Sequence, residues 1–148
     1  MWTYLNGEFI PKEEVRISPF DRGFLFGDSV YEVIPSYNNK LFLFDEHLER
    51  LKNSLSVTNI TTPESLKDLH PLMMELLKKN EFSNQAIYIQ ITRGEDPERS
   101  HVSDGSTVPT LFMSSTELEI NPYRKSPHKE GLKVKLEEDI RWKRCDVK

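Results

Sequence analysis

The chain has 148 residues, which fits one ordinary domain and is long enough to bury a hydrophobic core. Apolar residues make up 36% of it and charged residues 30%, and with a net charge of −4 and a pI of about 5.6 no basic stripe points to nucleic acid. No apolar run approaches the roughly 18 residues that cross a bilayer, and the N-terminus lacks a secretory pattern. The lone Cys145 cannot form an internal disulfide. We therefore expect a cytoplasmic protein that binds neither membranes nor nucleic acid.

The first part of the chain predicts a hairpin, a loop and a strand. Trp2–Leu5 and Glu8–Ile10 flank an Asn-Gly pair that suits a type I′ turn. Ser18–Asp28 contains a Ser-Pro pair and two glycines and is predicted to be a loop. Ser29–Tyr37 is rich in β-branched and aromatic residues, which favours a strand. Pro35 requires that strand to end early, to bulge or to lie at an edge of the sheet.

Two helices are predicted next. The Asn-Asn pair at 38–39 turns the chain into Leu41–Phe44. Asp45 is a good N-cap for a first helix that carries leucines at helical spacing. Thr62 and Pro63 are suited to cap and open a second helix, and Asn80 is a plausible end for it.

The remaining sequence predicts two more strands and a domain boundary. Ala86–Thr92 alternates, with isoleucines on one face and Tyr88 and Gln90 on the other, and Val108–Ser114 is a further strand candidate. Residues 1–120 therefore predict an N-terminal α+β domain of mostly antiparallel strands with two helices. Residues 121–130 are predicted to be a linker, and residues 131–148 the start of a second domain with Gly131–Glu137 as its first strand. Because a strand needs partners, we expect a truncated chain.

Four short segments carry residues whose chemistry goes beyond packing. Tyr31 stands just inside the strand that follows the loop, and Arg50 lies among leucines on a helix, where a guanidinium can clamp a phosphate. Arg99 and His101 are two apart in a polar loop, and both can donate hydrogen bonds to a carboxylate. The amine of Lys148 can condense with an aldehyde cofactor when it is neutral. Taken singly, these are also explained by a strand aromatic, a snorkelling arginine, a solvated loop and an exposed lysine.

Together these segments resemble the class IV (fold-type IV), pyridoxal-phosphate-dependent aminotransferases, and most closely the D-amino-acid transaminases among them. The resemblance covers essentially the whole chain and is strongest over residues 22–32, Arg-Gly-Phe-Leu-Phe-Gly-Asp-Ser-Val-Tyr-Glu, and residues 139–148, Asp-Ile-Arg-Trp-Lys-Arg-Cys-Asp-Val-Lys. It implies the N-terminal small domain of the D-amino-acid aminotransferase-like fold, an antiparallel sheet with two helices, in a chain that stops at the cofactor lysine.

The resemblance implies roles for five residues. Lys148 matches the catalytic lysine that binds pyridoxal 5′-phosphate covalently and moves the substrate α-proton. Arg50 matches the arginine that binds the cofactor phosphate, and Tyr31 matches a tyrosine beside the substrate carboxylate. Arg99 and His101 match an Arg-x-His carboxylate trap that the neighbouring subunit of a homodimer lends, although this chain has one extra residue just before the pair. No metal is implied.

The implied activity is transamination of D-amino acids, in which D-alanine and 2-oxoglutarate give pyruvate and D-glutamate. In this family the acidic partner of the cofactor ring and further phosphate ligands follow the lysine, so we expect the full-length parent to be active and the 148-residue chain itself to be inactive. A chain that continues beyond a modified Lys148 is an alternative that an intact mass decides. Three other functions stay open: a branched-chain L-amino-acid aminotransferase, an aminodeoxychorismate lyase, and a stand-alone non-catalytic domain.

Overall fold

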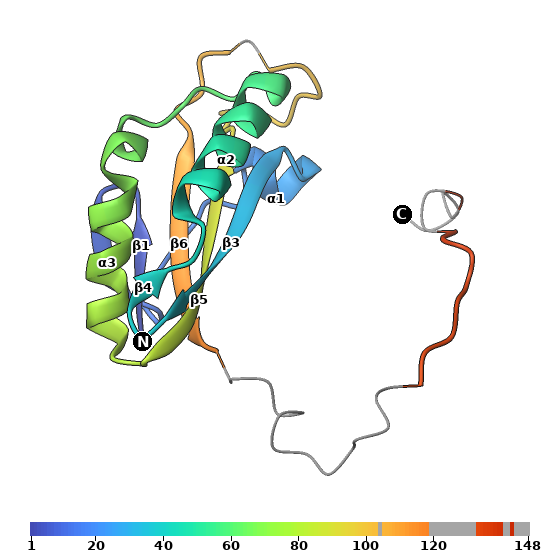
Figure 1. Ribbon diagram of the computed structural model, residues 1–148. Helices are drawn as coiled ribbons and strands as arrows, with labels where there is room; N and C mark the ends of the chain where they lie inside the picture. The colour runs from blue at the N-terminus through green and yellow to red at the C-terminus, as the bar shows by residue number, and fades with distance from the viewer. Residues whose placement is uncertain (104, 119–132, 141–142, 144–148) are drawn as a thin grey trace.

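The computed structural model describes residues 1–103, 105–118, 133–140 and 143 (Figure 1). Its elements in chain order are β1 (Trp2–Leu5), β2 (Glu8–Pro11), α1 (Arg22–Phe26), β3 (Ser29–Tyr37), β4 (Lys40–Leu41), α2 (Phe44–Thr58), the short 3-10 helix η1 (Glu64–Asp68), α3 (Leu69–Asn80), β5 (Asn84–Thr92) and β6 (Thr110–Glu117).

The six strands form one antiparallel sheet in the order β2-β1-β6-β5-β3-β4. Both long helices lie against the same face of this sheet, α2 along β3 and α3 along β1 and β6 (Figure 1). Because side chains alternate along a strand, every second residue points into the core beneath the helices. The predicted α+β architecture, an antiparallel sheet with two main helices, is confirmed.

Burial follows that alternation closely. The core is made of strand residues that face the helices and of the apolar faces of α2 and α3; its fully buried members include Ile34, Leu51, Leu55, Met73, Leu76, Ile87, Ile89, Ile91, Leu111 and Met113. Neither long helix covers the opposite face of the sheet; in the described part of the chain only the short helix α1 reaches it, where Gly23 lies against the side chain of Thr92 at the end of β5. On that face Tyr31 is 64% exposed and Val33 is 43% exposed, so a row of large side chains on β3 stays accessible.

The N-terminal hairpin was predicted correctly, and its turn has the expected conformation. Asn6 and Gly7 both have positive φ angles, 47° and 107°, as a type I′ turn requires. The predicted loop Ser18–Asp28 was only partly right, since it contains the five-residue helix α1. Asp21 caps α1 by accepting a hydrogen bond from Gly23 N, and Gly27 ends it at φ 66°.

The starts of the two long helices differ from the predicted ones. α2 begins at Phe44 with Leu43 as its N-cap residue, so Asp45 lies in the first turn, where a carboxylate favours the helix dipole. After the turn at residues 38–39, the chain forms only the two-residue strand β4 before α2 begins. The second helix becomes η1 followed by α3, because Pro71 lacks an N–H and fits only the first turn of an α-helix.

Pro35 neither ends nor bulges β3. It pairs in register with Ala86 of β5, and on its other side its carbonyl accepts a hydrogen bond from Phe42 N at 2.9 Å. The N–H and C=O of one strand residue point to the same side, so the position of the missing proline N–H faces β4 and not β5. The short strand β4 pairs only with Ser36 and Tyr37 among the described residues. As a result, residues 29–34 of β3 have no strand partner on that side within the described structure.

The second predicted domain lies largely outside the described residues, as does Lys148. Of the predicted strand Gly131–Glu137, residues 133–137 are described, and they form no strand and have exposed side chains. That prediction is wrong for those residues, because no neighbouring strand of the described chain offers them backbone partners. The linker and the domain boundary at 121–130 stay predictions.

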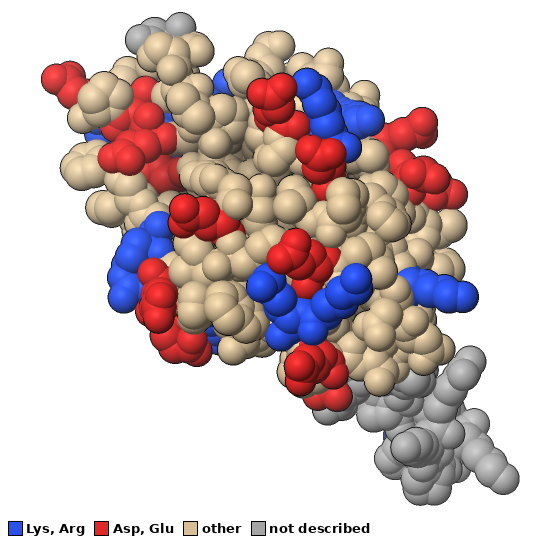
Figure 2. Space-filling model, turned by 90° about the vertical axis from the view of Figure 1, so that its left-hand side faces the viewer, with Lys and Arg blue, Asp and Glu red and all other residues tan. Residues whose placement is uncertain are grey.

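Charge is distributed evenly on the side of the molecule that lies to the left in Figure 1. Acidic and basic groups alternate there between uncharged patches, and neither sign forms a continuous stripe (Figure 2). Among the described residues, no helix combines the length and the apolar character needed to cross a membrane.

Ile89 provides a test of the core, because it sits on β5 in the middle of the sheet and is fully buried. Ile89→Ala should lower the free energy of unfolding by about 2–5 kcal/mol, through lost apolar burial and the cavity that remains. Urea denaturation measures the change. Val57→Ala on α2 is the control: Val57 is 75% exposed, and its replacement should shift stability by less than about 0.5 kcal/mol. Similar losses for both variants would contradict the described core.

Candidate functional site

A shallow pocket of about 420 Å³ lies where the free edge of β3 meets α2. Tyr31, Glu32 and Val33 of β3 and Arg50 and Ser54 of α2 line it. Three consecutive strand residues reach one pocket because the strand edge is uncovered there, so side chains from both faces of the sheet border it. Arg50 and Ser54 are one helical turn apart and therefore project from the same side of α2.

A buried carboxylate fixes the guanidinium of this pocket. Glu32 Oε1 accepts from Arg50 Nε at 2.6 Å, and Glu32 Oε2 accepts from Arg50 Nη2 at 2.7 Å. His47 Nδ1, one turn earlier on α2, lies 2.8 Å from Oε2. The Glu32 side chain is only 6% exposed, whereas that of Arg50 is 65% exposed. Hydrogen bonds from Arg50, and then from His47, lower the pKa of Glu32 against the opposing effect of burial.

This arrangement leaves one end of Arg50 available. Nε and Nη2 are occupied by Glu32, while Nη1 has no hydrogen-bond partner among the described residues. The bidentate pair removes the rotational freedom of the side chain before any ligand arrives. The pocket can therefore bind an anion of phosphate type through a pre-positioned guanidinium.

Two tyrosines lie next to that pocket on the face of the sheet away from the helices. Tyr31 of β3 and Tyr88 of β5 stack with ring centroids 5.7 Å apart. Burial, with a smaller contribution from Tyr31, raises the pKa of Tyr88 above its ordinary value of 10.0. Its phenol therefore stays protonated at neutral pH and keeps a hydrogen-bond donor on this face of the sheet.

Arg99 and His101 come together at a different place, the ring of Phe26 at the end of α1. The Arg99 guanidinium lies 5.0 Å from the centroid of that ring, and the His101 ring lies 5.3 Å from it. The extra residue before the pair thus does not separate the two side chains. Both residues are exposed, and neither lines the pocket of Tyr31 and Arg50. Within one chain the structure therefore forms two separate groups of candidate residues.

The start of the loop that carries this pair depends on Gly94. Its φ of 104° is unfavourable for other residues, and a Cβ there would overlap the carbonyl oxygen of Val108. The Gly94 carbonyl also accepts from Arg22 N at 2.8 Å, which joins the loop to α1.

Sequence analysis missed Glu32 and Tyr88 as members of the site. Glu32 alternates with Val30 and Ile34 on the core face of β3, and a carboxylate at such a position requires a hydrogen-bonding or cationic partner. That signal was available and pointed to the arginine on the next helix. Tyr88 was recognised as facing away from the isoleucines, but its partner Tyr31 follows only from the register between β3 and β5.

Comparison with known sequences gives one consistent result. A family model described as amino-transferase class IV matches residues 29–148. The chain is 39% identical over 146 residues to a D-alanine aminotransferase of Staphylococcus epidermidis, covering 99% of this chain and 51% of that protein. It is 33% identical over 148 residues to a D-alanine aminotransferase of Listeria monocytogenes, covering 100% and 51%. The chain thus spans about half the length of the curated relatives it matches.

Solved structures agree on the fold. A branched-chain amino acid aminotransferase from Escherichia coli superposes with a TM-score of 0.72 at 19% identity, over 79% of this chain and 41% of that one. A branched-chain aminotransferase from Thermoproteus uzoniensis gives a TM-score of 0.71 at 21% identity, over 80% and 41%. At these identities the likeness concerns the fold alone.

The Glu32 ion pair makes a pH-dependent contribution to stability. Because its folded pKa is lowered, the stabilisation is fully present above the ordinary pKa of 4.5 and is lost as the pH falls through the lower, folded value. Glu32→Gln should therefore destabilise the chain at neutral pH, and its difference from wild type should shrink on acidification. Chemical denaturation across this pH range measures it.

The matched control for that series is Glu49→Gln, at an exposed residue of α2, the helix that carries Arg50, with no ion pair among the described residues. It should follow the wild-type curve at every pH. If the Glu32→Gln difference stayed constant down to acid pH, the ion pair would not be the source of the stabilisation.

Proposed function

This chain belongs to the class IV aminotransferases, and we propose that it is the N-terminal part of a pyridoxal-phosphate-dependent D-amino-acid transaminase. The proposed reaction of the full-length enzyme moves an amino group from D-alanine to 2-oxoglutarate and gives pyruvate and D-glutamate. We propose further that the enzyme is a cytoplasmic homodimer. The observation that carries the proposal is the pre-positioned Arg50 guanidinium beside Tyr31, in a chain whose curated relatives are D-alanine aminotransferases.

The described residues fit the phosphate end of the cofactor. A phosphate needs a planar, charged donor that is already oriented, and the Glu32 carboxylate orients Arg50 in this way while leaving Nη1 free of partners in the described chain. The pocket volume of about 420 Å³ lies within the range of cofactor and ligand sites. When bound, the cofactor supplies the electron sink for charge that develops at the substrate α-carbon.

Cofactor attachment, proton transfer and binding of the substrate carboxylate are proposed for other residues of the chain. Lys148 is proposed to hold the cofactor and to move a proton at the substrate α-carbon as general base and acid. Tyr31 is proposed to lie on the substrate carboxylate side, where its stacking on Tyr88 fixes the ring. Arg99 and His101, which lie apart from the pocket in one chain, are proposed to bind the substrate carboxylate of the neighbouring subunit.

A branched-chain L-amino-acid aminotransferase is the second candidate on this scaffold. The structural likeness to such enzymes is a likeness of fold at 19–22% identity, which carries no substrate information. The intact Arg99-x-His101 pair favours the D-amino-acid transaminase. An aminodeoxychorismate lyase, and a non-catalytic domain for the 148-residue chain alone, are the other outcomes that an assay distinguishes.

The full-length gene product should transaminate D-alanine with 2-oxoglutarate, and it should act more slowly on L-leucine and on aminodeoxychorismate. Product formation by chromatography measures each activity. Lys148→Ala is the control: it should abolish turnover and also the covalent cofactor adduct that borohydride reduction traps. An L-leucine rate above the D-alanine rate would favour the branched-chain enzyme, and an unchanged adduct would contradict the role of Lys148.

Two arginine variants of the full-length protein should weaken the binding of different ligands. Arg50→Ala should raise the Kd for the cofactor by about ten- to hundred-fold, the range that loss of a charge-assisted hydrogen bond implies. Arg99→Ala should raise the KM for D-alanine and 2-oxoglutarate by a similar factor and leave cofactor affinity unchanged. Cofactor titration and steady-state kinetics separate the two. Equal losses of both properties in Arg99→Ala would contradict the carboxylate-trap role.

A further inference from the structure

Arg22 is the most enclosed cation of the described chain that has a role in none of the steps above. It belongs to α1, is 4% exposed, and donates to two carboxylates: Nε to Asp28 at 3.0 Å and Nη1 to Asp96 at 2.6 Å. These carboxylates raise the pKa of Arg22 further, so it is charged at every physiological pH. A buried charge is tolerated only when its hydrogen bonds are satisfied, and here they are.

The remaining donors of Arg22 reach the backbone of the Arg99–His101 segment. Nη1 donates to the carbonyl of Ser100 at 2.8 Å, and Nη2 donates to the carbonyl of His101 at 3.3 Å. The guanidinium also lies 4.9 Å from the centroid of Phe26, the ring that Arg99 and His101 contact. Arg22 thus holds the main chain of this segment and packs on the ring that supports its two side chains.

Little else in the described structure holds that segment. Residues 97–103 form no helix or strand, and most of their side chains are exposed. Among the hydrogen bonds between described residues, those that reach the backbone of residues 99–101 from outside the segment come from Arg22. The position of Arg99 and His101 therefore depends on a side chain that is more than 70 residues away in sequence.

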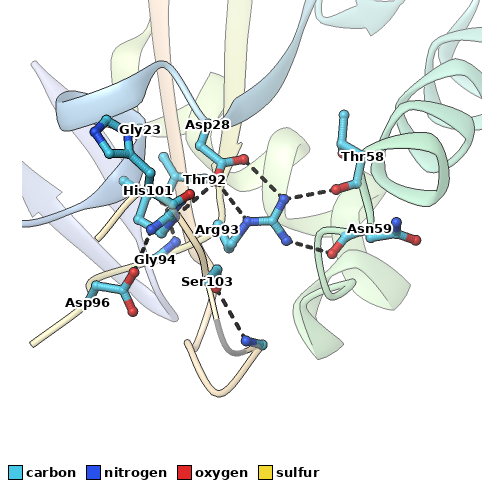
Figure 3. A network of polar contacts seen from close by, with 12 residues as sticks. Gly23, Asp28, Thr58, Asn59, Thr92, Arg93, Gly94, Asp96, His101 and Ser103 are labelled. Carbon is cyan, nitrogen blue, oxygen red and sulfur yellow. Dashed lines mark hydrogen bonds and ion pairs between the residues drawn. The ribbon is translucent and has the colours of Figure 1, made fainter. Parts of the chain in front are cut away.

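The network behind Arg22 is itself anchored. Asp28 accepts from Arg93 at 2.8 Å and 3.1 Å on its two oxygens, and Arg93 donates onward to the carbonyls of Thr58 and Asn59 at the end of α2 (Figure 3). Figure 3 shows Asp28 facing the Arg93 guanidinium, with Asp96 and His101 close to the same strand end. Asp28 is thus fixed from two sides and provides a rigid base for Arg22.

We propose that Arg22 is a positioning residue for substrate-carboxylate binding: it sets the loop that presents Arg99 and His101. This rests on the proposed function of those two residues. Arginine is required because one planar group must serve four acceptors at once, two carboxylates and two carbonyls, which a lysine ammonium with three donors cannot do.

The test compares full-length wild type with Arg22→Lys and with Arg16→Lys. Arg16 is the matched control, since it is exposed and, among the described residues, donates only to the nearby carbonyls of Glu13 and Val15. Arg22→Lys should speed hydrogen exchange in the peptide that contains residues 97–103 by about tenfold or more and leave the β5 peptide unchanged. It should raise the KM for both substrates by about tenfold, with a smaller change in kcat and an unchanged Kd for the cofactor. Arg16→Lys should match wild type throughout.

Each outcome decides the proposal. Unchanged exchange in the loop overturns it, and so does faster exchange with unchanged KM, because the loop would then be held without serving the substrate. If wild type does not turn over, the proposed function fails instead, and the Kd for pyruvate replaces KM in the same comparison. If Arg22→Lys does not fold, Asp96→Asn removes one arm of the network and should give the same effects to a smaller extent; its failure to do so overturns the proposal.

Discussion

β3 and β5 pair over nine residues, from Ser29 opposite Thr92 to Tyr37 opposite Asn84, and both groups of candidate residues depend on that register. It places Tyr31 and Tyr88 on the same face, where they stack, and it brings Asp28, just before β3, beside Arg93, just after β5. A slip of one residue would move Glu32 to the open face and Tyr31 into the core. The large apolar set on the core face of both strands prevents that slip.

Two carboxylates beside this register, the buried Glu32 and the partly buried Asp28, are held in the same way. Glu32 contacts Arg50 and His47, Asp28 accepts from Arg22 and Arg93, and these hydrogen bonds lower the pKa of both carboxyls against the opposing effect of burial. Removing the cationic partner of the enclosed Glu32 carboxylate should destabilise the folded chain, because that charge is left without compensation. Exposed pairs such as Lys67–Glu64 contribute about 0–1 kcal/mol. The interactions that hold the candidate residues are therefore among the strongest polar contacts of the described chain.

The main elements follow from local pattern, and the site follows only partly. Alternation predicted most of β5, β-branched and aromatic residues predicted β3 with its observed bounds, and the Asn-Gly pair predicted the first turn, because these features depend on near neighbours. The capping of α2 by Leu43 and the break before α3 were missed, since a tight return from β4 and Pro71 outweigh residue preference there.

Tyr31, Arg50, Arg99 and His101 were named from the resemblance, and the structure brings them together as two pairs rather than one group. The hydrogen bonds that orient them could not be predicted from sequence. Glu32 lies 18 residues from Arg50, and Arg22 lies 79 residues from His101, and contacts at such separations are set by sheet topology. Lys148 lies outside the described residues and remains a prediction.

The uncovered edge of β3 has a consequence for solubility. A strand edge with free N–H and C=O groups is where another chain can add a strand, and proteins protect such edges with charge, proline or short neighbouring strands. β3 has all three: the Glu32–Arg50 pair at the open stretch, Pro35 at its end, and the two-residue strand β4 beyond it. The Glu32–Arg50 ion pair, which orients the guanidinium in the pocket, therefore also discourages aggregation through this edge, so a substitution that breaks the pair should affect both properties.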